Sequence, residues 1–67
     1  MARDIVTELE EEGSSLNSKY VKLVAFIKSK AWGKINPHQQ ALMLEQKSTM
    51  ANYLAVLANR IKQIKGN

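Results

Sequence analysis

The sequence has no cysteine, and among its 67 residues it has only one histidine, one proline and three glycines. Without cysteine, neither a disulfide framework nor a thiolate metal site can form. The single histidine would need carboxylate ligands beside it to hold zinc, and after residue 12 the sequence offers only Glu45. We therefore expect no metal, no cofactor and a reducing, cytoplasmic environment.

Long apolar runs are missing as well. No stretch approaches the ~20 residues of a membrane-spanning helix. The acidic beginning, MARDIVTELEEE, has no apolar segment typical of a secretory signal. We expect no membrane contact. A single domain of this size buries only about 60% of its chain surface, so a partner copy would help it to fold.

Acidic residues become rare after residue 12. Residues 1–12 carry five acids and one base, a net charge of −4, whereas residues 13–67 carry nine bases and one acid, a net charge of +8. The two blocks give the overall charge of +4. Such asymmetry indicates either an anion-binding surface or attraction between two parts of one fold.

The apolar pattern predicts two long helices. In the first half, apolar residues recur at helical spacing with a near-heptad period: Ile5, Leu9, Leu16, Tyr20, Leu23 and Ile27. Glu12 and Gly13 occupy the missing step, and a glycine costs about 1 kcal/mol in a helix interior. A break near Gly13 is thus an alternative, but the stripe stays in phase, which favours one helix over about 4–31.

Residues 32–36 are expected to form a loop, with Gly33 as the C-terminal cap of the first helix. A helix start follows, because Asn36 can cap, Pro37 suits the first helical position and Gln39 suits a capping box. The second helix is predicted over about 37–65. Its stripe is Met43, Met50, Leu54, Leu57, Ile61 and Ile64, with Gln46 at the intervening core position.

Two helices of similar length with a short connection predict an all-α fold of one domain, residues 1–67, an antiparallel two-helix hairpin. Facing positions would sum to about 68, which places Glu8 beside Arg60 and Asp4 beside Lys65. Part of the charge asymmetry is then internal pairing. The lysines left over lie in the middle and at the loop end of the hairpin: Lys19, Lys22, Lys28, Lys30, Lys34 and Lys47.

The second helix also carries apolar residues away from its main stripe, namely Ala51, Ala55 and Ala58 with Tyr53 and Val56 beside them. The first helix likewise has Val21, Val24 and Ala25. One hairpin cannot bury both sets, which predicts a homo-oligomeric helical bundle. A polar Gln46 in its core would fix the register, or else contact a ligand.

Catalysis is not indicated, and we expect a protein that is not an enzyme. His38 lies at a predicted exposed first turn, and the hydroxyl residues have no visible base. No glycine-rich phosphate loop or metal-ligand spacing is present.

Binding is better supported, because lysine and arginine hold phosphates and aromatic rings stack on bases. The candidate ligand-binding residues are Tyr20, Lys22, Trp32, Lys34, Tyr53 and Arg60. The alternatives are a core role for Tyr20, a cover over the core end for Trp32 and a solvated face for the lysines.

The stretch KLVAFIKSKAWGKINPHQQALMLEQKSTMANYLAVLANRI resembles a family of small uncharacterised helical-hairpin proteins of tailed phages, including crAss-like phages. The resemblance covers about residues 19–61. Its first part rests on Lys22, Leu23, Phe26 and Ile27, followed by Trp32, Ile35, Asn36, Gln39, Leu42 and Met43. Its second part rests on Gln46, Met50, Tyr53, Leu57, Arg60 and Ile61.

The architecture is also similar, more loosely, to the anti-CBASS and Thoeris anti-defence sponge proteins of phages. This similarity implies an oligomer in the cytoplasm of an infected bacterial host that sequesters a cyclic-nucleotide or ADP-ribose-type immune signal at its subunit interfaces. Two alternatives stay open. One is a hairpin dimer that binds nucleic acid, and the other is a protein-binding inhibitor of a host factor.

Overall fold

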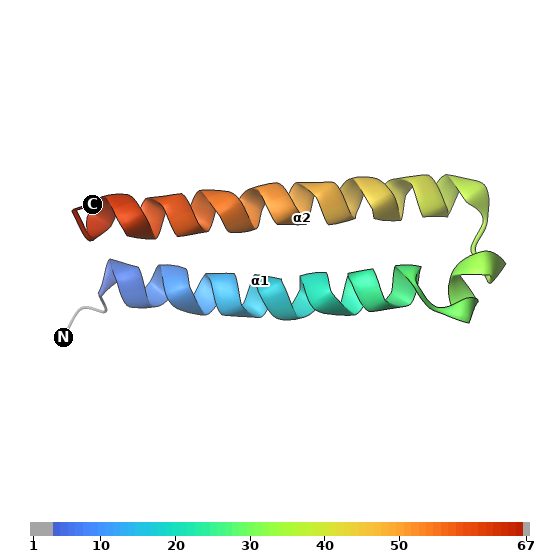
Figure 1. Ribbon diagram of the computed structural model, residues 1–67, viewed down its shortest axis with the longest axis horizontal. Coiled ribbons are helices and arrows are strands. Elements are labelled where there is room, and N and C mark those ends of the chain that lie inside the picture. The colour runs from blue at the N-terminus through green and yellow to red at the C-terminus, as the bar shows by residue number, and fades with distance from the viewer. Residues whose placement is uncertain (1–3, 67) are drawn as a thin grey trace.

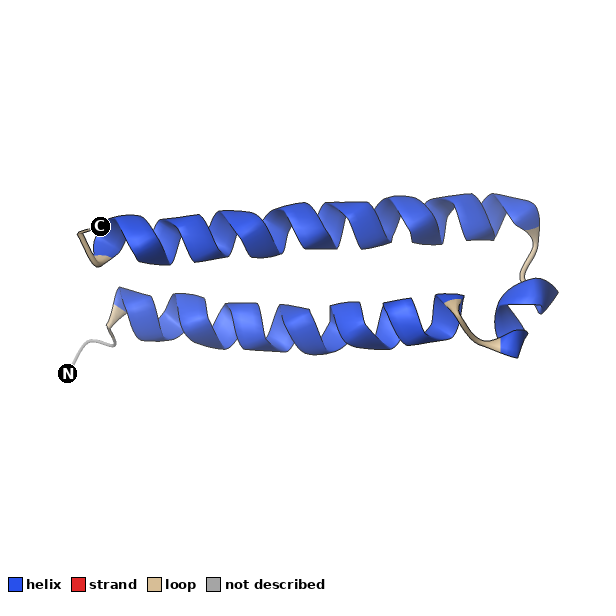
Figure 2. Cartoon of the chain, in the orientation of Figure 1, coloured by secondary structure: helices blue, strands red, loops and turns tan. Residues whose placement is uncertain are grey.

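The computed structural model describes residues 4–66. These residues form helix α1 (Ile5–Ile27), a short 3-10 helix η1 (Lys30–Lys34) and helix α2 (Pro37–Ile64). The two long helices lie side by side and antiparallel, and η1 closes one end (Figures 1 and 2). The hairpin measures 48 × 21 × 15 Å. The expected all-α hairpin is confirmed for the described residues.

Helix α1 begins at a capped end and runs through its glycine. The Asp4 carboxylate accepts a hydrogen bond of 3.2 Å from the backbone N–H of Val6, which satisfies one free donor of the first turn. The helix then continues past Gly13 without a break. Because the apolar stripe stays in phase across Gly13, contacts with α2 outweigh the low helix propensity of that residue.

Helix α1 ends at Ile27 rather than near Ala31, because Ser29 leaves the helix. The Ser29 backbone is extended, and both its N–H and its hydroxyl donate to the carbonyl of Phe26. Serine side chains compete for helix carbonyls in this way. The expected cap at Gly33 is wrong, since Lys28 takes that position in a right-handed conformation.

The start of α2 matches the sequence pattern. Asn36 is the N-cap, its side-chain oxygen accepting a hydrogen bond of 2.9 Å from the N–H of Gln39, and Pro37 occupies the first turn. The Gln40 amide donates to the carbonyl of Trp32 over 2.8 Å. The Trp32 ring meets Phe26 edge-on, with 6.5 Å between ring centroids. Trp32 therefore covers the loop end of the core.

The contact between the helices follows a seven-residue repeat on each. Its half-buried or buried positions in α1 are Val6, Leu9, Gly13, Leu16, Tyr20, Leu23 and Ile27, and those in α2 are Gln40, Met43, Lys47, Met50, Leu54, Leu57 and Ile61. Among residues 4–66, only Leu9 and Leu57 are fully buried, at 3% and 1% exposure. A single hairpin therefore has a seam rather than a closed core.

Three expected core positions are wrong. Ile5 and Ile64 expose 45% and 46% of their surface, and Val6 takes the step next to Leu9 in place of Ile5. Gln46 is exposed, and Lys47 takes the step between Met43 and Met50. The errors at Ile5 and Gln46 each shift the seam by one residue, or about 100° around the helix. Ile64 lies beyond Ile61, the last half-buried position of α2.

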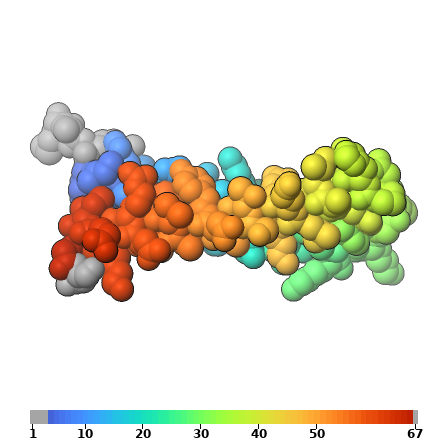
Figure 3. Space-filling model, turned by 90° about the horizontal axis from the view of Figure 1, so that it is seen from above, coloured from blue at the N-terminus to red at the C-terminus, as the bar shows by residue number. Residues whose placement is uncertain are grey.

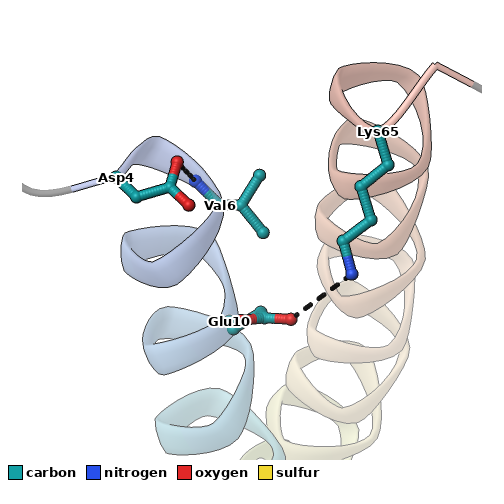
Figure 4. Close-up of polar contacts among 4 residues, drawn as sticks. All are labelled: Asp4, Val6, Glu10 and Lys65. Carbon is teal, nitrogen blue, oxygen red and sulfur yellow. Dashed lines mark hydrogen bonds and ion pairs between the residues drawn. The ribbon is translucent and has the colours of Figure 1, made fainter.

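The charged ends of the hairpin are paired in part. Glu10 and Lys65 form an ion pair of 3.8 Å across the end that holds the chain termini, here called the open end (Figure 4). Both side chains are more than half exposed, so the pair contributes only ~0–1 kcal/mol. Lys65 thus pairs with Glu10 in place of the expected Asp4, which caps α1 instead.

Candidate functional site

One face of α2 is exposed along most of the helix and carries a second repeat. Its members recur in steps of three and four, which places them in one sector of the helix surface. We call this face the outer strip, and it comprises Leu42, Gln46, Thr49, Tyr53, Val56, Arg60 and Ile64. Its apolar members are 40–49% exposed. In the view of Figure 3, α2 forms the front of a long rod.

Tyr53 is held at the edge of the outer strip by α1. Its hydroxyl donates a short hydrogen bond to the carboxylate of Glu12. That hydrogen bond raises the pKa of the Tyr53 phenol above its usual value, helped by partial desolvation and the negative charge of Glu12, whereas Arg60 opposes the shift. The same hydrogen bond fixes the position of the Tyr53 ring, which is 40% exposed.

Arg60 lies seven residues after Tyr53, about 10 Å further along the same face. It lines an open hollow of about 480 Å³ together with Val56, Asn59, Gln63 and Ile64. A guanidinium beside apolar side chains can bind an anion while the rest of a ligand covers the apolar surface. Tyr53 and Arg60 thus form an aromatic and cationic pair on one face.

The other four candidate residues lie elsewhere. Tyr20 is half-buried on the seam of α1, which agrees with its alternative role in the core, and Lys22 is exposed on α1. Trp32 and Lys34 belong to η1 at the loop end, where Trp32 is half-buried and Lys34 is exposed. The structure therefore separates the six residues into three groups along the hairpin.

A single chain does not bring these groups together. Trp32 and Lys34 lie at one end of the rod, whereas Arg60 lies near the open end (Figure 1). From Pro37 to Arg60, α2 alone spans about 35 Å. One small ligand cannot contact both ends of the same chain.

The leftover lysines are distributed as the sequence indicates, with one exception. The exposed lysines are Lys19, Lys22, Lys28, Lys30 and Lys34, whereas Lys47 is half-buried on the seam.

Within residues 4–66, no three His, Cys, Asp or Glu side chains gather as a possible metal site. In the same range, neither helix has the length and apolar character needed to cross a membrane.

Two residues that contribute to this site, Glu12 of α1 and Ile64 of α2, were not among the candidates from the sequence. Glu12 orients Tyr53, and Ile64 borders the hollow beside Arg60. The signal for Ile64 was present in the spacing of Tyr53, Val56, Arg60 and Ile64. It was obscured because Ile64 also lies seven residues after Leu57 and so fits the repeat of the seam. Nothing in the sequence shows which of the five acids in residues 1–12 contacts Tyr53.

Comparison with known proteins identifies a family. The model of a family described as Sequestin matches residues 3–63, nearly the whole chain. No curated protein and no solved structure matches. The matched range includes α1, η1 and all of α2 and of the outer strip except Ile64.

Proposed function

The chain belongs to the Sequestin family, and from this premise we propose that it is a phage anti-defence protein that binds and sequesters a small immune signalling molecule. The family name indicates sequestering of a molecule, which fits binding without turnover. The proposed ligand is a cyclic nucleotide or an ADP-ribose-type nucleotide. It would bind where subunits meet, in the cytoplasm of the infected bacterial cell.

The observation that carries the ligand class is the pair formed by Tyr53 and Arg60. A base or nicotinamide-like ring stacks on an aromatic face, and phosphate binds a guanidinium through two parallel hydrogen bonds. The two side chains share one face, about 10 Å apart. A nucleotide spans that distance from its base to its phosphate. The apolar hollow next to Arg60 would cover the sugar edge.

Tyr20, Lys22, Trp32 and Lys34 remain part of the proposed binding set. Their separation from Arg60 within one chain means that they act on the same ligand only if a second copy supplies them. The exposed Lys22 and Lys34 would then contact phosphate, and the partly exposed Trp32 ring would stack. This requirement agrees with binding at a subunit interface.

Isothermal titration against a panel of cyclic and ADP-ribose-type nucleotides tests the proposal. Binding of at least one member with a dissociation constant well below 100 µM is expected, and that threshold corresponds to about −5.5 kcal/mol. If no member of the panel binds at a protein concentration of about 100 µM, the proposal is wrong. The bound nucleotide should be recovered unchanged after the protein is heated and removed.

Matched variants then test the named residues. Arg60→Gln should weaken binding at least about tenfold through the lost charged hydrogen bonds. Tyr53→Ala should weaken it by about 1–3 kcal/mol, whereas Tyr53→Phe keeps most of the stacking. Lys62→Gln removes one charge on another side of α2 and is the control, with binding unchanged. Equal losses in Arg60→Gln and Lys62→Gln would mean that only the overall charge acts.

The exposed lysines of the loop half favour a second candidate, a nucleic-acid-binding dimer. In that case the affinity would fall steeply with salt, since each phosphate contact releases counterions. A synthetic RNA hairpin and a DNA duplex, each titrated at about 50 and 200 mM salt, distinguish the two functions, because several contacts predict a loss of order 10³ over that range. A nucleotide held by one or two charges would lose far less.

A further inference from the structure

The single hairpin exposes more surface than a compact protein of its size. A folded monomer of 7.5 kDa is expected to expose about 4,200 Å², whereas this chain exposes 5127 Å². The excess of about 900 Å² is close to the ~800 Å² that each partner loses in a stable protein interface. The excess exposed area of the chain is thus about the area that one partner buries in a stable interface.

The outer strip is the face that can supply this interface. It holds four of the exposed large apolar side chains, Leu42, Tyr53, Val56 and Ile64. The exposed apolar surface continues onto α1 through Ile5, which lies seven residues before Glu12 and so on the α1 face that meets Tyr53. Scattered apolar residues are ordinary on a surface, but a repeat along one helix marks an interface.

The order of residues along the strip is nearly symmetrical about Tyr53. Leu42 and Ile64 lie eleven residues before and after it, and Gln46 and Arg60 lie seven residues before and after it. We infer that a second copy of the chain packs on the outer strip with α2 antiparallel to α2, about a two-fold axis near Tyr53. Leu42 of each copy then meets Ile64 of the other, and the two Tyr53 residues lie on either side of the axis.

Charge selects this direction over the parallel one. In a parallel pair, Arg60 would face Arg60 and Glu45 would face Glu45, and like charges in register repel. In the antiparallel pair, Arg60 lies opposite Gln46 and next to Glu45 of the second copy. Glu45 is the one acid of α2. A guanidinium has five N–H donors, so Arg60 can bind this carboxylate on one edge and a phosphate on another.

The antiparallel pair also changes the candidate site. It places the loop end of one copy beside the open end of the other, so that Trp32 and Lys34 of the second copy approach Arg60 and Ile64. The open hollow lined by Val56 and Arg60 then gains a second wall. The role of this wall in ligand binding rests on the proposed function, but the pairing itself does not.

The chain offers a matched control for the interface. Leu42 and Leu44 are the same residue type, lie two residues apart and expose 47% and 48% of their surface. They point to different sides of α2, since two residues turn the helix by about 200°. Only Leu42 belongs to the outer strip.

The first experiment measures mass in solution by light scattering and sedimentation. The full chain should be a dimer or a multiple of it at about 100 µM, and Leu42→Glu should weaken association at least about tenfold, because it places a charge in an apolar contact. Leu44→Glu should associate as the unchanged chain does. A monomeric unchanged chain, or equal effects of the two variants, would overturn the inference.

The second experiment does not depend on the stability of a charged variant. Because the chain has no cysteine, single cysteines report contacts directly. Under mild oxidation, Tyr53→Cys should cross-link to itself, and a mixture of Leu42→Cys and Ile64→Cys should give the mixed dimer. Leu44→Cys should stay uncross-linked. Self-linked Leu42→Cys without the mixed dimer would indicate parallel packing and overturn the proposal.

The two experiments separate this inference from the proposed function. The expected cross-links without any nucleotide binding would support the proposed interface and show that the proposed nucleotide ligand is wrong. Nucleotide binding by the unchanged chain, together with no cross-link in the Tyr53→Cys variant, would do the reverse.

Discussion

The open half of the hairpin and its loop half are stabilised in different ways. In the open half, Leu9 and Leu57 are almost fully buried, and Leu57 packs close to the Gly13 backbone. In the loop half, the seam includes Gln40 and Lys47, and its positions are only half-buried. There the chain is fixed by directed contacts, namely the Asn36 cap, the hydrogen bond from Gln40 to Trp32 and the Phe26–Trp32 ring contact.

This difference shows where stability and binding capacity lie. Burial of apolar surface does not depend on direction, so the open half gains stability wherever leucines meet. The loop half keeps polar groups on its seam and exposed lysines around it. Such a region contributes less to folding and remains available to bind anions.

The largest expected effect is the loss of the open-half core. Leu57→Ala should lower the free energy of unfolding by about 2–5 kcal/mol, because it removes buried methyl groups and leaves a cavity. Met50→Ala, at a half-buried seam position, should cost less. Chemical denaturation followed by circular dichroism at one fixed protein concentration measures both. Equal losses would mean that the two halves do not differ in this way.

The next effect would make the loop half resemble the open half. Lys47→Met should raise the free energy of unfolding by about 1 kcal/mol, since an apolar side chain gains more from partial burial than a lysine that must keep its charge in water. Lys62→Met, at an exposed position, is the control and should change little. A destabilised Lys47→Met would show that the lysine charge itself stabilises the seam.

A smaller gain is expected at Gly13. A Cβ at this position would lie 3.9 Å from Cδ1 of Leu57, an ordinary van der Waals distance. Gly13→Ala should therefore stabilise the protein by up to about 1 kcal/mol through helix propensity. Gly13→Val adds branched bulk at the same place and should lose that gain. Thermal unfolding of both variants measures the difference, and a destabilised alanine variant would mean that the helices are closer than this distance.

The smallest effect is spectroscopic and concerns Tyr53. Because the hydrogen bond to Glu12 raises the pKa of Tyr53, Glu12→Gln should lower it toward about 10, its ordinary value. A raised pKa stabilises the folded chain below pH ~10, and this contribution disappears as the pH rises through the raised value. Phenolate absorbance in a Tyr20→Phe background follows Tyr53 alone. Glu8→Gln removes a nearby charge without the hydrogen bond and should shift the pKa less.

Much of the fold could be predicted from local sequence features. The spacing of the apolar residues gave two helices, and Asn36 and Pro37 gave the start of the second. The end of the first helix was missed because a hydroxyl of Ser29 decides it, and many serines lie inside helices without ending them. Ile5 and Gln46 were misplaced because the neighbouring residues Val6 and Lys47 fit a helical stripe almost as well.

The candidate site could be predicted only in part. Spacing alone placed Tyr53 and Arg60 on one face, since residues seven apart share a face in any straight helix. It could not show that Glu12 reaches Tyr53, because that contact depends on how two helices lie against each other. The predicted antiparallel hairpin, by contrast, already implied that Trp32 at the loop and Arg60 beside the first turns of α1 lie at opposite ends of the rod.

By itself, the sequence determined the two long helices, the hairpin and the charge asymmetry, because these depend on local propensities and on the spacing of residues within each helix. Only the tertiary structure decided between neighbouring residues at the edges of the seam, where Val6 and Lys47 take the positions expected for Ile5 and Gln46. Neighbouring side chains fit one helical stripe almost equally well until another helix lies against them. The contact between Gly13 and Leu57 and the hydrogen bond between Glu12 and Tyr53 settle that choice, leaving the face from Leu42 to Ile64 exposed.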